Sequence, residues 1–600
     1  MANLYAERIA ALRAIMARNG WDAVIVTATD PHSSEYPALR WKQVEWLSGF
    51  SGEYGDIVVT MDHAGLWTDT RYFIAANKVL PGTGIELHKL RVPEQVTIPE
   101  WLPTVFPAGA VIAVDGLCQS ADAIAKLSSF EIVDVPDMLS QLWEDRPEIP
   151  QSPIETLGVE FAGESRLERF AWLRGFLQEK GCDAMLITDL AEIAWMLNVR
   201  GGDIAYNPLV MSYLLVSKDN VEWYVKKDSL KELDDETLDS FEELEKDGVK
   251  ISGYSDLAVG LMAAQNTCEK IYVDPATLNY TVSKKLADIF GDDNIVMAVS
   301  PIRLRKGIKN ATEIAGFREA YIEDGVAMTK FVYWLEKAVS GGGHVTEWDA
   351  SVKLTSLRAE IPGYKGDSFE NISAYGQGAA LPHYVTPQDD TAPELKPWGF
   401  YLIDSGGQYL FGTTDTTRTV PLGPCTDLER LDYTLVLRGM IDFTMSVFPY
   451  GTAGCRLDSL ARMPMWRAQR DFGHGTGHGT GFFLGVHEGP QDLRQNLYEQ
   501  AILPGMVTTI EPGLYREGMH GVRHENTNLC VDLGENEFRH WCGFEELTCC
   551  HIDTAPILKH LMTFEEIEWL NKFNEKVYRT LAPKLPAEIA AWLREKTLPL

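Results

Sequence analysis

The feature that most constrains this chain is a repeat within its first half. Residues 7–28 are ERIAALRAIMARNGWDAVIVTA, and residues 168–189 are ERFAWLRGFLQEKGCDAMLITD. In each copy an amphipathic helical pattern ends at a glycine, and an aspartate two residues later precedes a strand-like apolar run. The repeat predicts two α/β domains of common ancestry, over residues 1–160 and 161–305. The proline-rich segment 146–155 joins them.

A region of different character follows, over residues 306–600. Apolar residues recur at helical spacing between Ile314 and Leu335, and a glycine-rich run then ends that helix. From Trp398 onward β-branched residues and glycine turns indicate strands, and the last part is again helical. We therefore expect a third domain of α+β type.

Composition narrows the possible partners. The 600 residues are 45% hydrophobic and 23% charged, with a net charge of -32. So acidic a chain lacks the clustered Lys and Arg that nucleic acids require. No apolar run approaches the ~20 residues of a membrane helix, and the N-terminus lacks the apolar core of a signal peptide. Nine scattered cysteines favour reduced thiols. We expect a cytoplasmic protein that binds neither nucleic acid nor membrane.

Five potential metal ligands stand at the ends of expected strands. GFYLIDSGG carries Asp404 before a Gly-Gly turn, and GTTDTTRTV carries Asp415 eleven residues later. VTTIEPG carries Glu511, and GVRHENTNLCV carries Glu525 fourteen residues on. His478 lies between the two pairs, in HGTGHGTG. Hairpins of these lengths can bring each pair of carboxylates side by side.

Converging carboxylates repel one another unless some are protonated or cations are bound. Two divalent ions would remove the conflict, and in such sites they lie roughly 3.5–4 Å apart and share a water or hydroxide. Oxygen-rich ligation with one histidine suits Mn²⁺ best, with Zn²⁺ or Co²⁺ as alternatives. Taken singly, each residue could be an ordinary turn or loop residue. The ordered set of five predicts a two-metal site.

The motifs IDSGGQY, TTDTTRT, HGTGHGTG, IEPGLY and RHEN resemble those of the "pita-bread" metallopeptidases, which include aminopeptidase P, prolidase and methionine aminopeptidase. DPHSSEY, WLSGFSG, NVRGGDIAYNP and SPIRLRKGIKNATEI extend the resemblance over the whole chain, to the three-domain cytosolic type of aminopeptidase P. The resemblance implies two related creatinase-like α/β domains followed by a pita-bread catalytic domain. It also implies a homodimer through the catalytic domain.

The resemblance assigns roles to the five ligands. Asp404, Asp415 and Glu525 would bind one metal ion. The other would be held by Asp415, His478, Glu511 and Glu525, so that Asp415 and Glu525 bridge the two. The implied reaction is hydrolysis of an N-terminal Xaa-Pro bond by a metal-bridging hydroxide, with Glu511 accepting the proton of the attacking water.

Three further histidines match positions that line the substrate site in the family. His383, His474 and His487 would hold the carbonyls around proline and stabilise the tetrahedral oxyanion. Arg523, beside Glu525, would orient the metal ligands without binding a metal ion itself.

The sequence departs from the family pattern at three places. Phe411 precedes GTTD where the family often has Asp, and His524 precedes Glu525 where an apolar residue is usual. Thr480-Gly481 ends the glycine loop where an aliphatic residue is common. None of these departures replaces a ligand.

Two other functions share parts of this pattern. A prolidase has the same ligands but cleaves only dipeptides, and the duplicated N-terminal domain favours the aminopeptidase over it. Pita-bread relatives that serve as binding modules have lost ligands, whereas all five are present here. The creatine-hydrolase type works without metal, and the full ligand set disfavours it as well.

Overall fold

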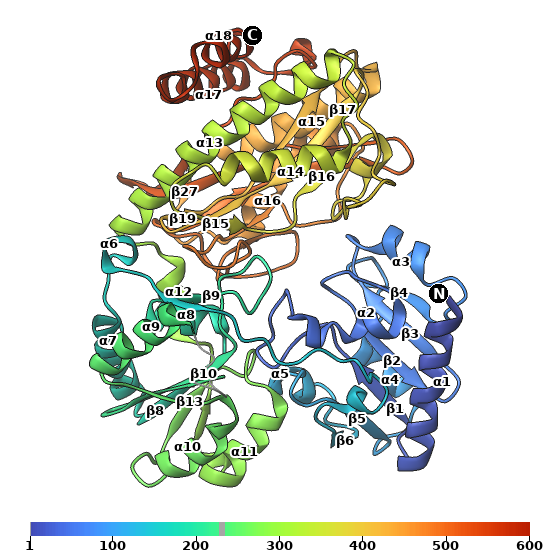
Figure 1. Cartoon of the computed structure of the whole chain (residues 1–600), viewed down its shortest axis with the longest axis vertical. Helices are drawn as coiled ribbons and strands as arrows, with labels where there is room; N and C mark the ends of the chain where they lie inside the picture. Colours follow the sequence, from blue (N-terminus) through green and yellow to red (C-terminus); the bar gives the residue numbers. More distant parts are fainter. Residues whose placement is uncertain (1, 227–233) are drawn as a thin grey trace. The chain divides into compact units, whose positions relative to one another are not determined.

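The computed structural model describes residues 2–226 and 234–600 (Figure 1). The chain forms two compact units. The first comprises Met1–Gly158 with Glu164–Ile302, and the second Val159–Gly163 with Arg303–Leu600.

The first unit contains two six-stranded mixed sheets. The sheet nearer the N-terminus has the order β4-β3-β2-β1-β5-β6. Its strands are β1 (Ala23–Val26), β2 (Asp56–Thr60), β3 (Ala64–Thr68), β4 (Glu86–Lys89), β5 (Val111–Val114) and β6 (Glu131–Asp134). β1, β2 and β3 pair antiparallel, and the other neighbours pair parallel. Its helices are α1 (Ala2–Asn19), α2 (Gln43–Ser48), α3 (Phe73–Val79), α4 (Ile98–Val105) and α5 (Ala121–Ala125).

The second sheet repeats this plan, in the order β12-β11-β10-β8-β13-β14. Its strands are β8 (Ala184–Ile187), β10 (Ser212–Ser217), β11 (Val221–Val225), β12 (Val249–Gly253), β13 (Ile271–Val273) and β14 (Ile295–Met297). Each pair has the same direction as its counterpart in the first sheet. Its helices are α7 (Arg166–Lys180), α8 (Leu190–Leu197), α9 (Asp235–Lys246), α10 (Leu257–Ala264) and α11 (Tyr280–Phe290). The prediction that the two N-terminal domains share one mixed-sheet fold is confirmed.

The repeat itself forms the helix and strand that begin each domain. Helix α1 is followed by Gly20 at φ 70°, and α7 ends at Gly181 at φ 66°. Both glycines occupy the left-handed conformation that commonly ends a helix and that other residues adopt at a cost. α7 begins with a capping box made by Ser165 and Glu168. The chain then enters the central strand of each sheet, β1 or β8, all of whose residues are buried.

The second unit is built from antiparallel sheets and long helices, as the α+β prediction required. Strands β16 (Ile372–Tyr375), β17 (Phe400–Ser405) and β20 (Thr416–Pro421) form one sheet. Another has the order β21-β28-β27-β24, from β21 (Phe448–Pro449), β24 (Val507–Ile510), β27 (Asn526–Glu535) and β28 (His540–Glu546). The helices are α13 (Ala311–Ser340), α14 (Glu347–Arg358), α15 (Asp427–Thr444), α16 (Gly454–Arg467), α17 (Phe564–Leu581) and α18 (Ala587–Lys596). A large apolar core joins α15, α16 and α17 to the second sheet.

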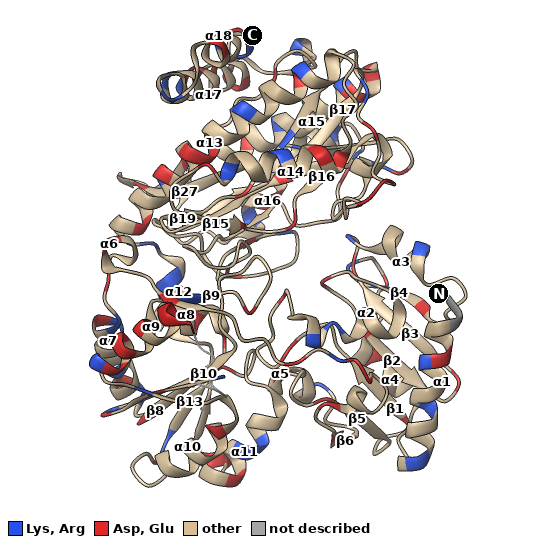
Figure 2. Cartoon of the chain, in the orientation of Figure 1, with Lys and Arg blue, Asp and Glu red and all other residues tan. Residues whose placement is uncertain are grey.

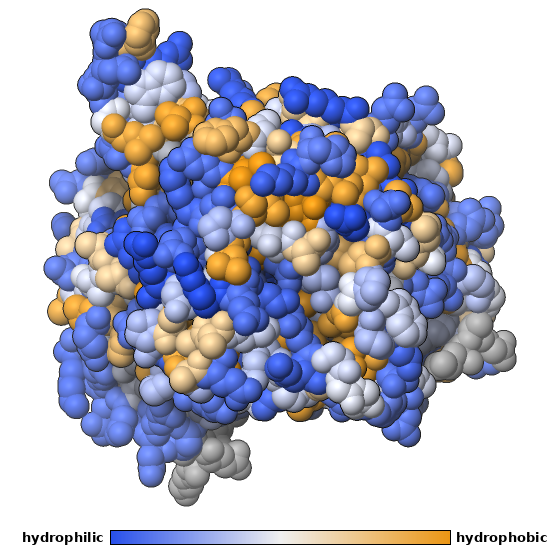
Figure 3. Space-filling view, turned by 90° about the horizontal axis from the view of Figure 1, so that it is seen from above, coloured by the Kyte–Doolittle hydropathy of each residue, from blue (hydrophilic) through white to orange (hydrophobic). Residues whose placement is uncertain are grey.

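Acidic residues outnumber basic ones in the sequence, by 86 to 54. Figure 2 shows both charge signs along the helices, with Asp and Glu prominent on α9. On the face drawn in Figure 3, hydrophilic side chains surround patches of apolar ones. Among the described residues, no helix has the length and apolar character needed to span a membrane. All nine cysteines are free thiols, as expected.

Candidate metal centre

The first pair of carboxylates comes from adjacent antiparallel strands. β17 pairs with β20, and Asp404 lies opposite Thr417. Asp415 stands two residues before Thr417, just ahead of β20. Because strand side chains alternate between faces, Asp415 and Thr417 share a face, and Asp404 is the diagonal neighbour of Asp415. The two aspartates therefore face the same space.

The second pair extends another ladder. β24 and β27 end their pairing with Ile510 opposite Asn526. Glu511 is the next residue after Ile510, and Glu525 is the residue before Asn526. The Glu525 backbone N–H donates to the Thr417 carbonyl, at 3.2 Å, which ties the two pairs together.

His478 reaches the cluster from the short strand β22 (Gly477–His478). Its backbone N–H donates to Thr509 Oγ1 at 3.1 Å. A Cβ at Gly477 would lie 1.9 Å from the Thr509 carbonyl oxygen, so this close approach requires glycine. The His478 Nδ1 lies 2.9 Å from the Gly479 carbonyl, and its Nε2 lies 3.5 Å from both Asp415 Oδ2 and Glu511 Oε1. The Nδ1–H contact fixes the ring so that Nε2 faces the carboxylates.

The electrostatics of the cluster fit bound cations. Ligand atoms of Asp415, His478 and Glu525 all lie within 4.8 Å of one another. Burial and the adjacent carboxylates raise the pKa of Asp415 and that of Glu525 well above their ordinary values. Burial and Glu525 raise the pKa of Glu511 to about 7. Asp404 Oδ1 and Glu525 Oε1 are buried without a hydrogen-bond partner. Buried oxygens in that state require a proton or a cation.

Arg523, in β26 (His520–Arg523), supports the cluster from one side. Its Nη2 donates to Asp404 Oδ2 at 2.6 Å and its Nε to Thr417 Oγ1 at 3.2 Å. Thr417 in turn donates to Glu525 Oε2 at 2.9 Å. The Arg523 Nη1 donates to the Tyr515 hydroxyl at 2.7 Å, and that hydroxyl lies 2.8 Å from His474 Nε2.

Sequence reasoning missed Thr417 and Tyr515 as parts of this network. Thr417 belongs to the motif TTDTTRT, which also contains Asp415, and Tyr515 belongs to IEPGLY, which also contains Glu511. Strand alternation was the available signal for Thr417, because it places Thr417 on the same face as Asp415. The pairing of β25 (Gly513–Arg516) with β26 brings Tyr515 close to Arg523, and nothing local in the sequence indicates that pairing.

Of the two remaining predicted histidines, His487 lies near the cluster. The His487 ring lies 4.3 Å from the His478 ring, at 77°. The residue after His487, Glu488, fixes this loop. It forms buried ion pairs with Lys306 at 2.8 Å and with Lys309 at 2.7 Å.

His383 is half-buried in the segment after the 3-10 turn Gly376–Ala380. That turn packs against β26, the strand that holds Arg523.

The departures from the family pattern lie in the surrounding packing. Phe411 stacks on Tyr409 with ring centroids 5.5 Å apart. His524 is fully buried with its ring edge-on to Tyr433 at 4.3 Å, and burial lowers its pKa well below the ordinary value. Thr480 is buried in the loop after His478.

Comparisons with known proteins agree with this architecture. Residues 315–532 match metallopeptidase family M24, and 540–600 match the C-terminal region of peptidase M24. Residues 8–142 and 145–313 each match a creatinase/prolidase N-terminal domain.

Full-length relatives exist in several organisms. Aminopeptidase P1 of Arabidopsis thaliana is 34% identical, over 99% of each chain. A probable Xaa-Pro aminopeptidase P of Sordaria macrospora is 35% identical, over 99% of each chain. The crystal structure of X-prolyl aminopeptidase from Caenorhabditis elegans, a cytosolic enzyme with a di-nuclear active site, superposes with a TM-score of 0.93 at 32% identity, covering 100% of both chains. The chain thus belongs to metallopeptidase family M24, within the group of the Xaa-Pro aminopeptidases P.

Proposed function

We propose that this protein is a dinuclear-metal aminopeptidase that removes the N-terminal residue from peptides with proline at the second position. The observation that carries the proposal is the cluster around His478. Ligand atoms of Asp415, His478 and Glu525 lie within 4.8 Å of one another, and His478 Nε2 also lies 3.5 Å from Glu511 Oε1. Two buried oxygens of the cluster, Asp404 Oδ1 and Glu525 Oε1, have no hydrogen-bond partner. The full-length similarity to Xaa-Pro aminopeptidases supports the same activity.

The proposed ligand assignment follows the shared strands. One ion would be held by Asp404, Asp415 and Glu525, and the other by Asp415, His478, Glu511 and Glu525. Three-quarters or more of the ligands offer oxygen, which suits Mn²⁺ better than softer ions, with Zn²⁺ and Co²⁺ as alternatives. Divalent ions bound in such a site would polarise a carbonyl and lower the pKa of bound water to about 7. Elemental analysis of the purified protein identifies the metal.

The chain's own residues would carry the proton and the orientation. Glu511 is proposed to accept a proton at a carboxylate oxygen from the attacking water and to pass it to the departing proline nitrogen. His487, whose ring lies 4.3 Å from that of His478, is proposed to donate to the developing oxyanion. His383 and His474 are proposed to hold the carbonyls on either side of proline, and Arg523 fixes the orientation of Asp404.

The substrate follows from the chemistry of the bond. An Xaa-Pro bond is a tertiary amide, whose nitrogen carries no hydrogen. Cleaving it calls for a strongly polarised carbonyl and a pocket shaped to a pyrrolidine ring. The free N-terminal ammonium group can lie against the carboxylate-rich cluster, which would place the cut one residue from the end.

A peptide panel tests the proposal. Arg-Pro-Pro, Arg-Ala-Ala, N-acetyl-Arg-Pro-Pro and Gly-Pro are incubated with the chelated protein and with the Mn²⁺-loaded protein. We expect cleavage of the first, little of the second and third, and dependence on metal throughout. Equal rates on the proline and alanine peptides would refute proline selectivity. Activity restricted to Gly-Pro would make the protein a prolidase, and no activity on any peptide would favour a binding module.

Three further properties belong to the same proposal. The domains are proposed to span 1–160, 161–305 and 306–600, with a cytoplasmic location and a homodimer formed through the last domain. Exposed apolar side chains in that region, such as Leu497 at 84% and Phe538 at 76% exposure, offer contact area for an interface. Light scattering measures the oligomeric state, and a monomer at micromolar concentration would count against the dimer.

A further inference from the structure

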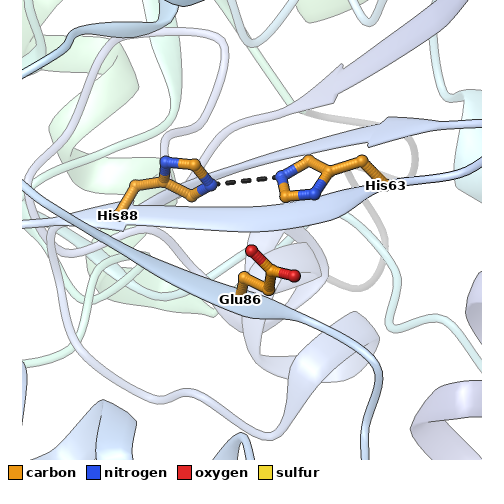
Figure 4. A group of neighbouring side chains, drawn as sticks. All are labelled: His63, Glu86 and His88. Carbon is orange, nitrogen blue, oxygen red and sulfur yellow. Dashed lines mark hydrogen bonds between the residues drawn. The ribbon is translucent and has the colours of Figure 1, made fainter.

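A second group of potential metal ligands lies in the first unit, on the N-terminal sheet. His63, Glu86 and His88 bring one ligand atom each to within 4.8 Å of one another. Figure 4 shows one ring nitrogen of His63 and one of His88 pointing at each other, with the Glu86 carboxylate beside the gap between them. The His63 Nε2 and His88 Nε2 atoms are 3.1 Å apart.

The edge of the sheet places Glu86 and His88 together. Both belong to β4, two residues apart, so their side chains share a face. β4 pairs parallel with β3, with Gly65 opposite Glu86 and Trp67 opposite His88. A Cβ at Gly65 would lie 2.7 Å from His88 Nε2, so glycine leaves the space that this ring occupies.

His63 arrives from the turn between β2 and β3, and that turn is tightly held. The Thr60 backbone N–H donates to the His63 carbonyl at 2.8 Å, and the His63 N–H donates to Thr60 Oγ1 at 2.9 Å. The ligand-bearing backbone is thus fixed on both sides of the gap, as a preorganised site requires.

Aromatic side chains fix the imidazole rings. His88 stacks on Trp67 with ring centroids 3.8 Å apart and planes at 10°. The Trp67 indole N–H donates to the Val96 carbonyl at 3.0 Å, which holds the stacking partner in place. Trp101 of α4 lies 5.1 Å from the His63 ring.

The spacing of the nitrogens matches that of two ligands on one ion. Zinc binds imidazole nitrogen at about 2.0–2.1 Å, so two such nitrogens at a tetrahedral angle lie about 3.3–3.4 Å apart. The observed 3.1 Å is close to that value. A neutral His–His hydrogen bond would account for the same distance, but it gives no role to the carboxylate beside the pair. Two histidines and a glutamate are a familiar set of zinc ligands with one position left open.

The second α/β domain shows what the same backbone does without such a ligand set. Its turn and ladder have the same hydrogen bonds, and there Asn220, Lys250 and Ser252 occupy the places of His63, Glu86 and His88. Glu222, at the place of Gly65, pairs with Lys250 at 2.8 Å and accepts from Ser252 at 2.6 Å. In that group Lys250 neutralises the charge of Glu222. The group in the first domain consists of two histidines and a glutamate, with no Lys or Arg among the three.

We propose that His63, Glu86 and His88 bind one transition-metal ion, Zn²⁺ by preference, with water in the remaining position. The half-buried setting leaves the ion open to solvent on one side. This ion would be additional to the two proposed for the M24 cluster, the group formed by Asp404, Asp415, His478, Glu511 and Glu525. The proposal does not depend on the peptidase activity.

Metal content tests the proposal in the full-length protein. The protein is stripped with a chelator, reloaded with Zn²⁺, desalted, and analysed for zinc per chain. We expect His88→Gln and His63→Ala each to lower the zinc content by about one ion per chain, with peptidase activity retained. The matched control is His344→Ala, which removes an exposed histidine paired with Glu394 and should leave the count unchanged. Equal zinc content in the wild type and both variants would overturn the proposal.

A second measurement needs no variant. Diethylpyrocarbonate modification, followed by peptide mass spectrometry, reports on each histidine separately. Zn²⁺ should protect His63 and His88 several-fold in the wild type, while His344 reacts equally with and without the metal. Unchanged reactivity at all three positions, together with unchanged zinc content in the variants, would leave the pair as a structural hydrogen bond only. Loss of peptidase activity on the peptide panel, with the zinc results as expected, would instead concern only the M24 cluster.

Discussion

The two groups of potential metal ligands differ chiefly in how much water reaches them. The M24 cluster is buried, and two of its carboxylate oxygens have no partner in the protein. The group formed by His63, Glu86 and His88 is half-buried to exposed, so water can satisfy its polar atoms when no ion is bound. Burying an unpaired charge is costly, while an exposed one costs little. We therefore expect the buried cluster to need bound cations to keep its carboxylates together, whereas the group of His63, Glu86 and His88 keeps its arrangement without an ion.

Asp415→Asn should have the largest effect, because Asp415 is the proposed bridge in the buried cluster. Its loss should lower the metal content at both positions and reduce kcat/KM by more than the about 10- to 100-fold typical of an outer partner. Elemental analysis and the Arg-Pro-Pro assay measure the two effects. The exposed Asp390→Asn is the control. Two tightly bound ions and full activity in Asp415→Asn would show that the bridging assignment is wrong.

His487→Ala should have the next largest effect. If its imidazole stabilises the oxyanion, kcat should fall by roughly 10²–10³-fold while metal content stays constant. That separation would distinguish a residue beside the cluster from a ligand within it. His560→Ala, at an exposed position, serves as the control. An unchanged kcat would show that His487 is a loop histidine without a role in catalysis.

Tyr515→Phe probes the outer network of the cluster. The change removes the hydroxyl that joins Arg523 to His474 and keeps the ring. We expect a loss of about 10- to 100-fold in activity, together with weaker metal binding, because the orientation of Asp404 relies on Arg523. Tyr498→Phe, in an exposed loop, is the control. Normal metal affinity and activity in Tyr515→Phe would mean that Arg523 orients Asp404 without this support.

The sequence predicted more of the fold than of the contacts around the site. The repeat at residues 7–28 and 168–189 was sufficient to predict two domains with one fold, because helix, glycine and buried strand all leave local patterns. The five proposed ligands were recognisable for the same reason, since each stands at a strand end beside glycine or within a motif. The α+β character of the region from residue 306 followed from its change of periodicity.

Contacts between distant segments were not predictable in this way. Tyr515 meets His474 only because β25, β26 and the glycine loop converge, and nothing near Tyr515 in the sequence indicates this. His63 and His88 come from a turn and an edge strand 25 residues apart. Two isolated histidines carry no pattern until the parallel pairing of β3 and β4 is known.

The smallest effect expected here comes from Glu347, a buried carboxyl that belongs to neither group of ligands. Its Oε1 accepts the Tyr375 N–H at 2.6 Å and its Oε2 accepts the Tyr384 hydroxyl at 2.8 Å. Burial raises its pKa to about 7. The folded state therefore holds a proton that the unfolded state releases at a lower pH. The associated stability is present below the unfolded pKa and is lost as the pH rises through about 7.

The melting temperature of the metal-loaded wild type should thus decline by a few degrees between pH 5 and pH 8 through this group. Glu347→Gln removes the titration and should flatten that part of the profile, while the exposed Glu517→Gln should not. Differential scanning calorimetry across this range makes the measurement. A Glu347→Gln profile as steep as that of the wild type would mean that Glu347 is ionised in the folded protein. Burial alone would then be a poor guide to the state of the carboxylates in the M24 cluster, and the comparison between buried and exposed ligands would have to rest on metal content alone.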